Sequence, residues 1–138
     1  MKNLFFTLVF SLIINSVFSQ CDGRYETEIF SSVTKTTVNY SDVYINGQHE
    51  MDIYTPDGDI EINRPLILFM HGGSFYAGSK TDTDCEDFCE SFAKRGYVTA
   101  SVNYRLVGIL DIISFLTYNS EQYEEVLKAT FDIKAAIR

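Results

Sequence analysis

The apolar positions of the chain predict two strands of different kinds. Residues 66–70 are apolar at every position, which is the pattern of a strand covered on both faces of a sheet. Val98, Ala100, Val102 and Tyr104 instead alternate with other residues, as expected for a strand with two distinct faces. We therefore expect both segments to be strands of a sheet.

Two helices are predicted from apolar residues at helical spacing. The buried stripe of the first consists of Cys85, Phe88, Cys89, Phe92 and Ala93. Asp82 or Asp84 can cap this helix, and Gly96 can end it because glycine readily adopts the left-handed conformation found there. Asn119 and Gln122 have the spacing of a capping box for the second helix. Its apolar face consists of Val126, Ala129, Ile133 and Ala136.

A hairpin is predicted ahead of these elements. Residues 43–45 and 51–54 have strand patterns, and the Asn-Gly pair at 46–47 supplies the positive φ that a tight turn requires. The Pro-Asp-Gly sequence at 56–58 has the chemistry of a turn that ends the second strand. Together these elements predict an α/β fold with a mostly parallel sheet and an antiparallel hairpin at its start.

The amino terminus has the pattern of a secretory signal peptide. A positively charged start precedes an apolar run over residues 4–14, and the residues that follow allow cleavage before Gln20. The run is shorter than the roughly 20 apolar residues of a membrane span. A lipoprotein is the other alternative, but Gln20 does not fit the motif that precedes a lipidated cysteine such as Cys21. We expect residues 1–19 to be a signal peptide, and the protein to be secreted or periplasmic with no membrane span.

The composition of the chain limits the classes of partner and ligand that it is expected to bind. The formal charge of −8 at pH 7 disfavours nucleic acid and anionic membrane surfaces, which bind basic patches. No cofactor is indicated and no metal site is expected, because the acidic run at 82–87 lacks the glycine of a calcium-binding loop. Cys21, Cys85 and Cys89 are an odd number for an exported protein, so one thiol stays free or pairs outside this sequence.

The stretch that carries the most chemical information follows the first apolar strand, where residues 71–80 read HGGSFYAGSK. Loops at the carboxyl ends of buried strands hold the ligands of open α/β sheets. Glycines such as Gly72 and Gly73 let backbone N–H groups approach a substrate. Fixed N–H groups stabilise the oxyanion that forms when an acyl carbonyl is attacked. The alternative is that these two glycines only turn the chain.

Three separated motifs together resemble the α/β-hydrolase superfamily, in particular its esterase/lipase and carboxylesterase branches. They are HGGSFYAGS after the apolar strand, then KRGYVTASVNYRL, then a helix ending in DIKAAIR. The resemblance covers residues 40–138 and implies the amino-terminal portion of an α/β-hydrolase fold. It also implies that the amides of Gly73 and Ser74 form the oxyanion hole, although many members have a third glycine where this chain has Ser74.

The resemblance assigns supporting roles to other residues. His71 and Gly72 correspond to residues that support the oxyanion loop, because the triad of this family runs Ser, then Asp or Glu, then His. Tyr104 and Arg105 match a strand-end motif and imply a structural bond. His49, near the predicted hairpin turn, is expected to be solvated.

The triad of such an enzyme is missing from this sequence. A G-x-S-x-G nucleophile elbow needs two glycines four positions apart, and no two glycines of the chain have that spacing. Both histidines precede the place where the nucleophile should come. Residues 20–138 are therefore predicted to be a partial hydrolase domain, with no catalytic residue in this chain.

The implied parent is a secreted serine hydrolase for carboxylic esters, either small-molecule or carbohydrate-linked, and this chain is expected to be inactive by itself. A secreted peptidase of the same fold is one alternative. A non-catalytic binding or adhesion protein on the same scaffold is another, because fold does not fix function.

Overall fold

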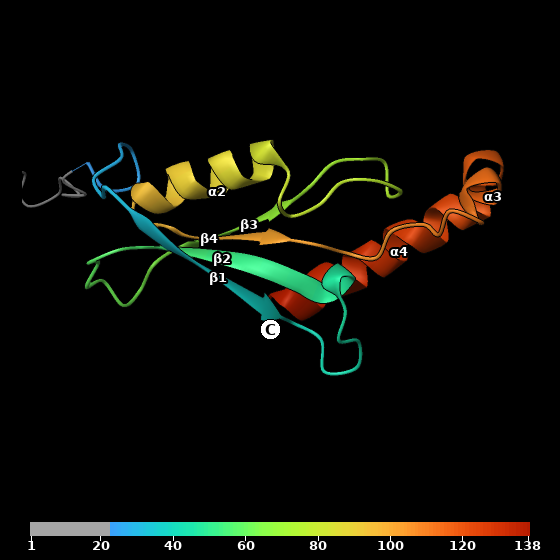
Figure 1. Ribbon diagram of the computed structural model, residues 1–138, viewed down its shortest axis with the longest axis horizontal. Coiled ribbons are helices and arrows are strands. Elements are labelled where there is room, and N and C mark those ends of the chain that lie inside the picture. Colours follow the sequence, from blue (N-terminus) through green and yellow to red (C-terminus); the bar gives the residue numbers. More distant parts are fainter. Residues whose placement is uncertain (1–22) are drawn as a thin grey trace, which may run out of the picture.

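The computed structural model describes residues 23–138, which form a four-stranded sheet with helices on both faces (Figure 1). The strands are β1 (Val33–Asn39), β2 (Glu50–Pro56), β3 (Leu66–Met70) and β4 (Val98–Val102). The helices are α2 (Thr83–Lys94), α3 (Ile112–Thr117) and α4 (Asn119–Ala136), and η1 (Gly47–His49) is a short 3-10 turn. The alternation of strands and helices confirms the predicted α/β class. The predicted signal peptide and Cys21 lie outside the described residues.

The sheet is mixed rather than mostly parallel, which corrects the prediction. Its strand order is β1-β2-β4-β3. The pairs β1–β2 and β2–β4 are antiparallel, and β3–β4 is parallel. Parallel neighbours need a crossover connection, and within residues 23–138 only β3 and β4 are joined by one, through α2.

The antiparallel hairpin exists, but its first strand and its turn were predicted wrongly. β1 pairs with β2 from Val33 opposite Pro56 to Asn39 opposite Glu50. Residues 43–45 belong to the long connection between these strands, and Asn46 begins η1 by accepting a hydrogen bond from the Gln48 amide. β1 is an edge strand with mostly exposed side chains, so it needs few apolar residues and gives a weak sequence signal.

The face of the sheet under α2 is closed by the predicted stripe. Cys85, Cys89 and Ala93 of this helix are fully buried, and Cys89 and Ala93 lie among Tyr54, Phe69 and Phe88. Gly96 ends the helix region with φ at +100°, as predicted. Cys85 and Cys89 are both free thiols in the described chain.

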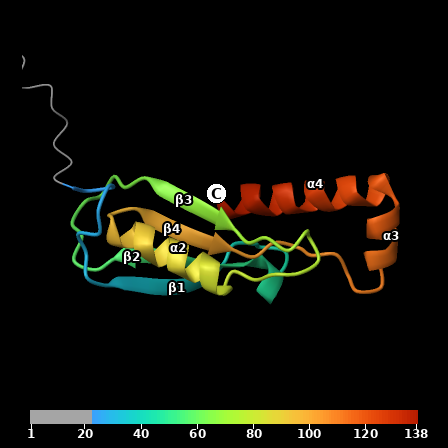
Figure 2. The ribbon, with the colours of Figure 1, turned by 90° about the horizontal axis from the view of Figure 1, so that it is seen from above.

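The opposite face is covered by the carboxyl end of α4. Ala136 and Ile133 pack against Ala100 and Val102 of β4, while Val126 is 42% exposed and lies off the buried stripe. α4 runs from beyond the carboxyl ends of β3 and β4 back toward the sheet (Figure 2). The helix has no side-chain cap, so the capping box predicted from Asn119 was wrong.

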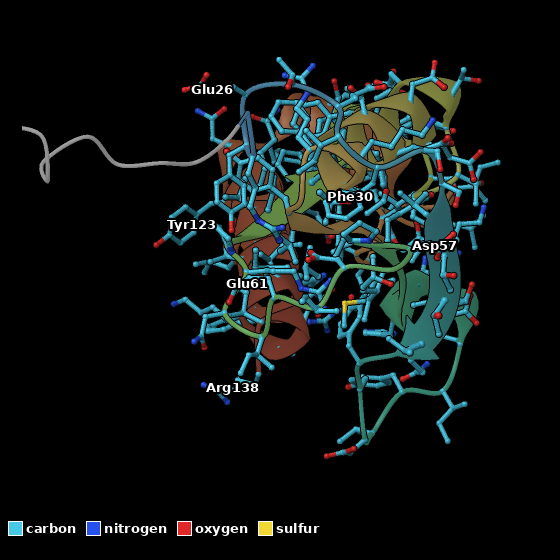
Figure 3. All side chains as sticks on the ribbon, turned by 90° about the vertical axis from the view of Figure 1, so that its left-hand side faces the viewer. Glu26, Phe30, Asp57, Glu61, Tyr123 and Arg138 are labelled. Atoms are coloured by element: carbon cyan, nitrogen blue, oxygen red, sulfur yellow. The ribbon has the colours of Figure 1, made fainter. Side chains whose placement is uncertain are left out.

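The other end of the sheet, where β3 and β4 begin, carries Phe30, Asp57 and Glu61 (Figure 3). There the Arg24 guanidinium donates to Asp59 at 3.1 Å. This end is remote from residues 71–80, which lie beyond the carboxyl ends of β3 and β4 (Figure 1). In the described range, 23–138, no helix is long and apolar enough to cross a membrane.

Candidate oxyanion loop

The loop at residues 71–80 turns on two glycines whose conformations other residues rarely adopt. Gly73 has φ at +105°, and the amides of Tyr76 and Ala77 both donate to its carbonyl at 3.1 Å. A Cβ atom on Gly73 would lie 2.1 Å from the carbonyl oxygen of Ala77. Gly78 has φ at +98°, and a Cβ there would lie 2.4 Å from the His71 ring. Gly72 has open space around its Cα and no such constraint.

The two residues that follow Gly73 are held in the same unusual region. Ser74 has φ at 53° and Phe75 has φ at 66°. Left-handed backbone in residues other than glycine costs roughly 1–3 kcal/mol each and clusters at functional sites. Ser74 therefore tolerates the dihedral angles of the loop at an energetic cost, in the place where many α/β-hydrolases have glycine.

The backbone N–H groups of Gly73 and Ser74 are the two candidate oxyanion donors of the loop. Neither donates a hydrogen bond to any residue in the part of the chain that the structure describes. Backbone donors without internal partners in a fixed turn are available to an incoming anion or to a carbonyl oxygen. Their position, at the carboxyl end of a parallel strand, is where α/β sheets bind ligands.

His71 is buried at the start of this loop. Its side chain is only 3% exposed, and Nδ1 donates to the Gly72 carbonyl oxygen at 2.7 Å. The ring of Tyr104 stacks on the imidazole, with 4.4 Å between centroids. His71 is therefore held between the Gly72 carbonyl and the Tyr104 ring, and its supporting role in the loop stays a prediction.

An apolar hollow of about 360 Å³ lies beside the loop. It is lined by Met70, Phe75, Val126, Ala129, Thr130, Ile133 and Lys134. The hollow therefore lies between the end of β3 and the exposed half of α4.

His49 is buried, so its predicted solvation was wrong. Only 2% of the residue is exposed. Nδ1 donates to the Asn46 side chain at 2.8 Å, and Nε2 lies 3.8 Å from Asp132. Asp132 is itself held by the Arg105 guanidinium at 2.8 Å, which is the structural bond expected at the strand-end motif. The sequence concealed this cluster because its members come from three separate segments.

The burial of His49 makes the stability of the chain depend on pH. Burial lowers the pKa of His49, the nearby Asp132 carboxylate raises it less, and the Arg105 charge lowers it further. Because the folded pKa lies below the unfolded value near 6.5, the unfolded chain binds the proton more readily. We expect stability to be constant above that value and to fall as the pH drops through the lowered pKa. Urea unfolding followed by circular dichroism between pH 7.5 and 5.5 measures this.

A His49→Gln variant is the control for that pH dependence. It retains a polar side chain but has no proton to gain in this pH range. Its unfolding midpoint should change much less between pH 7.5 and 5.5 than that of the parent chain. Equal pH dependence in both proteins would contradict the assignment to His49.

The end of the loop is tied to the sheet by a buried ion pair that the sequence did not indicate. The Lys80 ammonium donates to Asp52 at 2.7 Å, and the two residues are 7% and 1% exposed. The Thr37 hydroxyl also donates to Asp52 at 2.6 Å. Neither hydropathy nor spacing signals the pair, because its members are 28 residues apart on different elements.

Residues 51–124, just over half of the chain, match the family model of BD-FAE. The chain belongs to the BD-FAE family. The BD-FAE region contains the whole of the loop at residues 71–80, together with α2 and β4. No curated protein matches the sequence.

Two solved structures similar to this BD-FAE chain are esterases. One is esterase B from Lactobacillus rhamnosis, inhibited with a tributyrin phosphonate, with 19% identity and a TM-score of 0.57; the similarity covers 99% of this chain and 39% of that one. The other is a truncated carbohydrate esterase from gut microbiota, with 23% identity and a TM-score of 0.50, covering 83% of this chain and 34% of that one. The BD-FAE chain thus has part of an α/β-hydrolase fold, and it spans about two fifths of the length of esterase B.

Proposed function

We propose that the chain supplies the oxyanion loop of a secreted serine hydrolase that acts on carboxylic esters. The observation that carries the proposal is the pair of amides at Gly73 and Ser74. They have no acceptor among residues 23–138, and they lie in a strained turn at the carboxyl end of β3. The BD-FAE match and the esterases of similar fold support the same class of reaction.

The proposed chemistry is acyl transfer through a serine that lies outside this sequence. The serine oxygen attacks the ester carbonyl and gives its proton to a histidine, while the carbonyl oxygen becomes an oxyanion. The amides of Gly73 and Ser74 donate to that oxyanion. The tetrahedral intermediate then expels the alcohol, which takes the proton from the histidine, and water later releases the acid.

The proposed substrates are small-molecule or carbohydrate-linked esters. The apolar hollow beside the loop suits the acyl part of such a substrate. The proposal includes export by the amino-terminal signal sequence, with cleavage before Gln20. We also propose that this chain is inactive by itself, because an oxyanion hole without a nucleophile has no covalent step.

The first test is hydrolysis of p-nitrophenyl acetate. The 138-residue chain should give no rate above buffer, and a fluorophosphonate probe should not label it. Turnover by this chain that a fluorophosphonate abolishes would contradict the assignment of the nucleophile to another segment.

The second half of the test uses the reading frame beyond codon 138. If that frame encodes a serine elbow, an acid and a histidine, the longer protein should hydrolyse the ester. Gly73→Pro, which removes one donor N–H, should then lower kcat by about 10²–10³, the usual cost of losing one oxyanion donor. Ser74→Ala, which keeps its amide, should cost much less. An unchanged kcat in Gly73→Pro would show that another loop stabilises the oxyanion.

A further inference from the structure

We propose that Asn103 and Tyr104, adjacent residues just after β4, form a clamp that positions the amides of Gly73 and Ser74. Tyr104 holds the start of the loop, and Asn103 holds its end. The role of the loop as an oxyanion hole rests on the proposed function, but the clamp itself does not. Both members act through other residues and are positioning residues, not catalytic ones.

The start of the loop is held by the side chain of Tyr104. Its hydroxyl donates to the carbonyl oxygen of His71 at 2.9 Å, and the residue is 3% exposed. Its ring stacks on the His71 imidazole at an angle of 13°. The same ring meets Phe75 edge-on, with 6.1 Å between centroids. Tyr104 therefore contacts the residues on either side of Gly72, Gly73 and Ser74.

The end of the loop is held by the side chain of Asn103. Its Oδ1 accepts the Lys80 amide at 2.6 Å, and its Nδ2 donates to the Gly47 carbonyl at 2.6 Å. The Asn103 backbone amide donates to the Glu50 carbonyl of β2 at 3.0 Å. Donor and acceptor are both used, which only an amide side chain of this length provides.

Because the two holding residues are consecutive, the clamp fixes the distance between the two ends of the loop. A loop with fixed ends has fewer accessible conformations than one with free ends, which favours a single shape of the turn at Gly73. One backbone bond reinforces it, from the Val107 amide to the Phe75 carbonyl at 2.8 Å. The strained dihedral angles of Ser74 and Phe75 persist only where the surroundings hold them in this way.

Hydrogen exchange of the loop amides in the full chain tests the clamp. The amides of Tyr76 and Ala77 donate to the Gly73 carbonyl, so their exchange reports opening of the turn. Tyr104→Phe removes the hydroxyl and keeps the ring. We expect exchange of these two amides to accelerate roughly 5- to 10-fold, the size of one lost hydrogen bond. Amides of α2 and of the β2–β4 pairing should keep their rates.

Tyr54→Phe is the matched control. Tyr54 is also 3% exposed, but its hydroxyl has no hydrogen-bond partner among residues 23–138. Removing that hydroxyl should change none of the exchange rates of the loop amides.

A second variant, Asn103→Ala, opens the clamp from its other end and should accelerate the same amides as Tyr104→Phe. The acceleration of exchange in the double variant should be smaller than the product of the two single accelerations, because both substitutions open the same closed loop.

Two results would overturn the clamp. One is unchanged exchange at Tyr76 and Ala77 in both Tyr104→Phe and Asn103→Ala. The other is an equal acceleration of all amides, including those of α2, which would make Tyr104 and Asn103 ordinary stabilising residues. Because the exchange measurement needs no hydrolysis, its outcome does not depend on the proposed ester chemistry.

Discussion

Replacing Gly73 with alanine should lower the free energy of unfolding by roughly 2–4 kcal/mol, from backbone strain together with overpacking. The residue has φ at +105°, where a side chain is strained, and the added Cβ would lie 2.1 Å from the Ala77 carbonyl oxygen. Both atoms of that contact are fixed by the backbone, so the loop has little freedom to move them apart. Gly78→Ala should have a similar effect, because its Cβ would lie 2.6 Å from the Gly72 carbonyl oxygen. Urea unfolding monitored by circular dichroism measures both.

Gly72→Ala is the matched control, because no atom lies within 4 Å of the place where its Cβ would be. Its stability should differ from that of the parent by less than about 1 kcal/mol. Similar losses at Gly72 and Gly73 would contradict the turn geometry. The sequence made these two glycines look alike, and the structure separates them: Gly73 is required by the turn and Gly72 is not.

Elements with a strong local signal were predictable from the sequence. The stripe of Cys85, Cys89 and Ala93 has helical spacing and is buried, and Gly96 ends that helix region. β3 was recognised because it is apolar at each position, but the predicted cover on both faces was wrong: in the described sheet β3 is an edge strand with no buried residue. The loop after β3 was recognised by its glycines and by a family resemblance. Its position in the fold was predictable because it directly follows that strand.

Features set by contacts between distant segments were not predictable. β1 was missed because an edge strand rich in threonine resembles a polar loop in sequence. Residues 43–45 were taken for a strand because they are apolar, yet Val43 and Ile45 are 79% and 87% exposed. His49 looked solvated beside Asn46 and Gly47, but it is buried, with Nε2 lying 3.8 Å from Asp132, a residue of α4.

Removing the Lys80 charge from its buried ion pair with Asp52 should strongly destabilise the chain. Lys80→Met leaves the Asp52 carboxylate 1% exposed, with the Thr37 hydroxyl as its remaining side-chain donor in the described chain. Removing one partner of a buried pair typically costs about 3–5 kcal/mol, because the other charge stays buried without compensation. Whole domains are stable by only about 5–15 kcal/mol, so this variant should be close to unfolding.

Two controls separate burial from charge. Lys35 and Glu86 form an ion pair of similar length, 2.8 Å, but their side chains are 45% and 37% exposed. Lys35→Met should therefore cost no more than about 1 kcal/mol. The double variant Lys80→Met/Asp52→Leu removes both buried charges and should recover most of the lost stability, since apolar replacements of buried pairs are often neutral or stabilising. If Lys80→Met lost no more stability than Lys35→Met, the end of the loop would have to be open to water, and Asp52 would not anchor it.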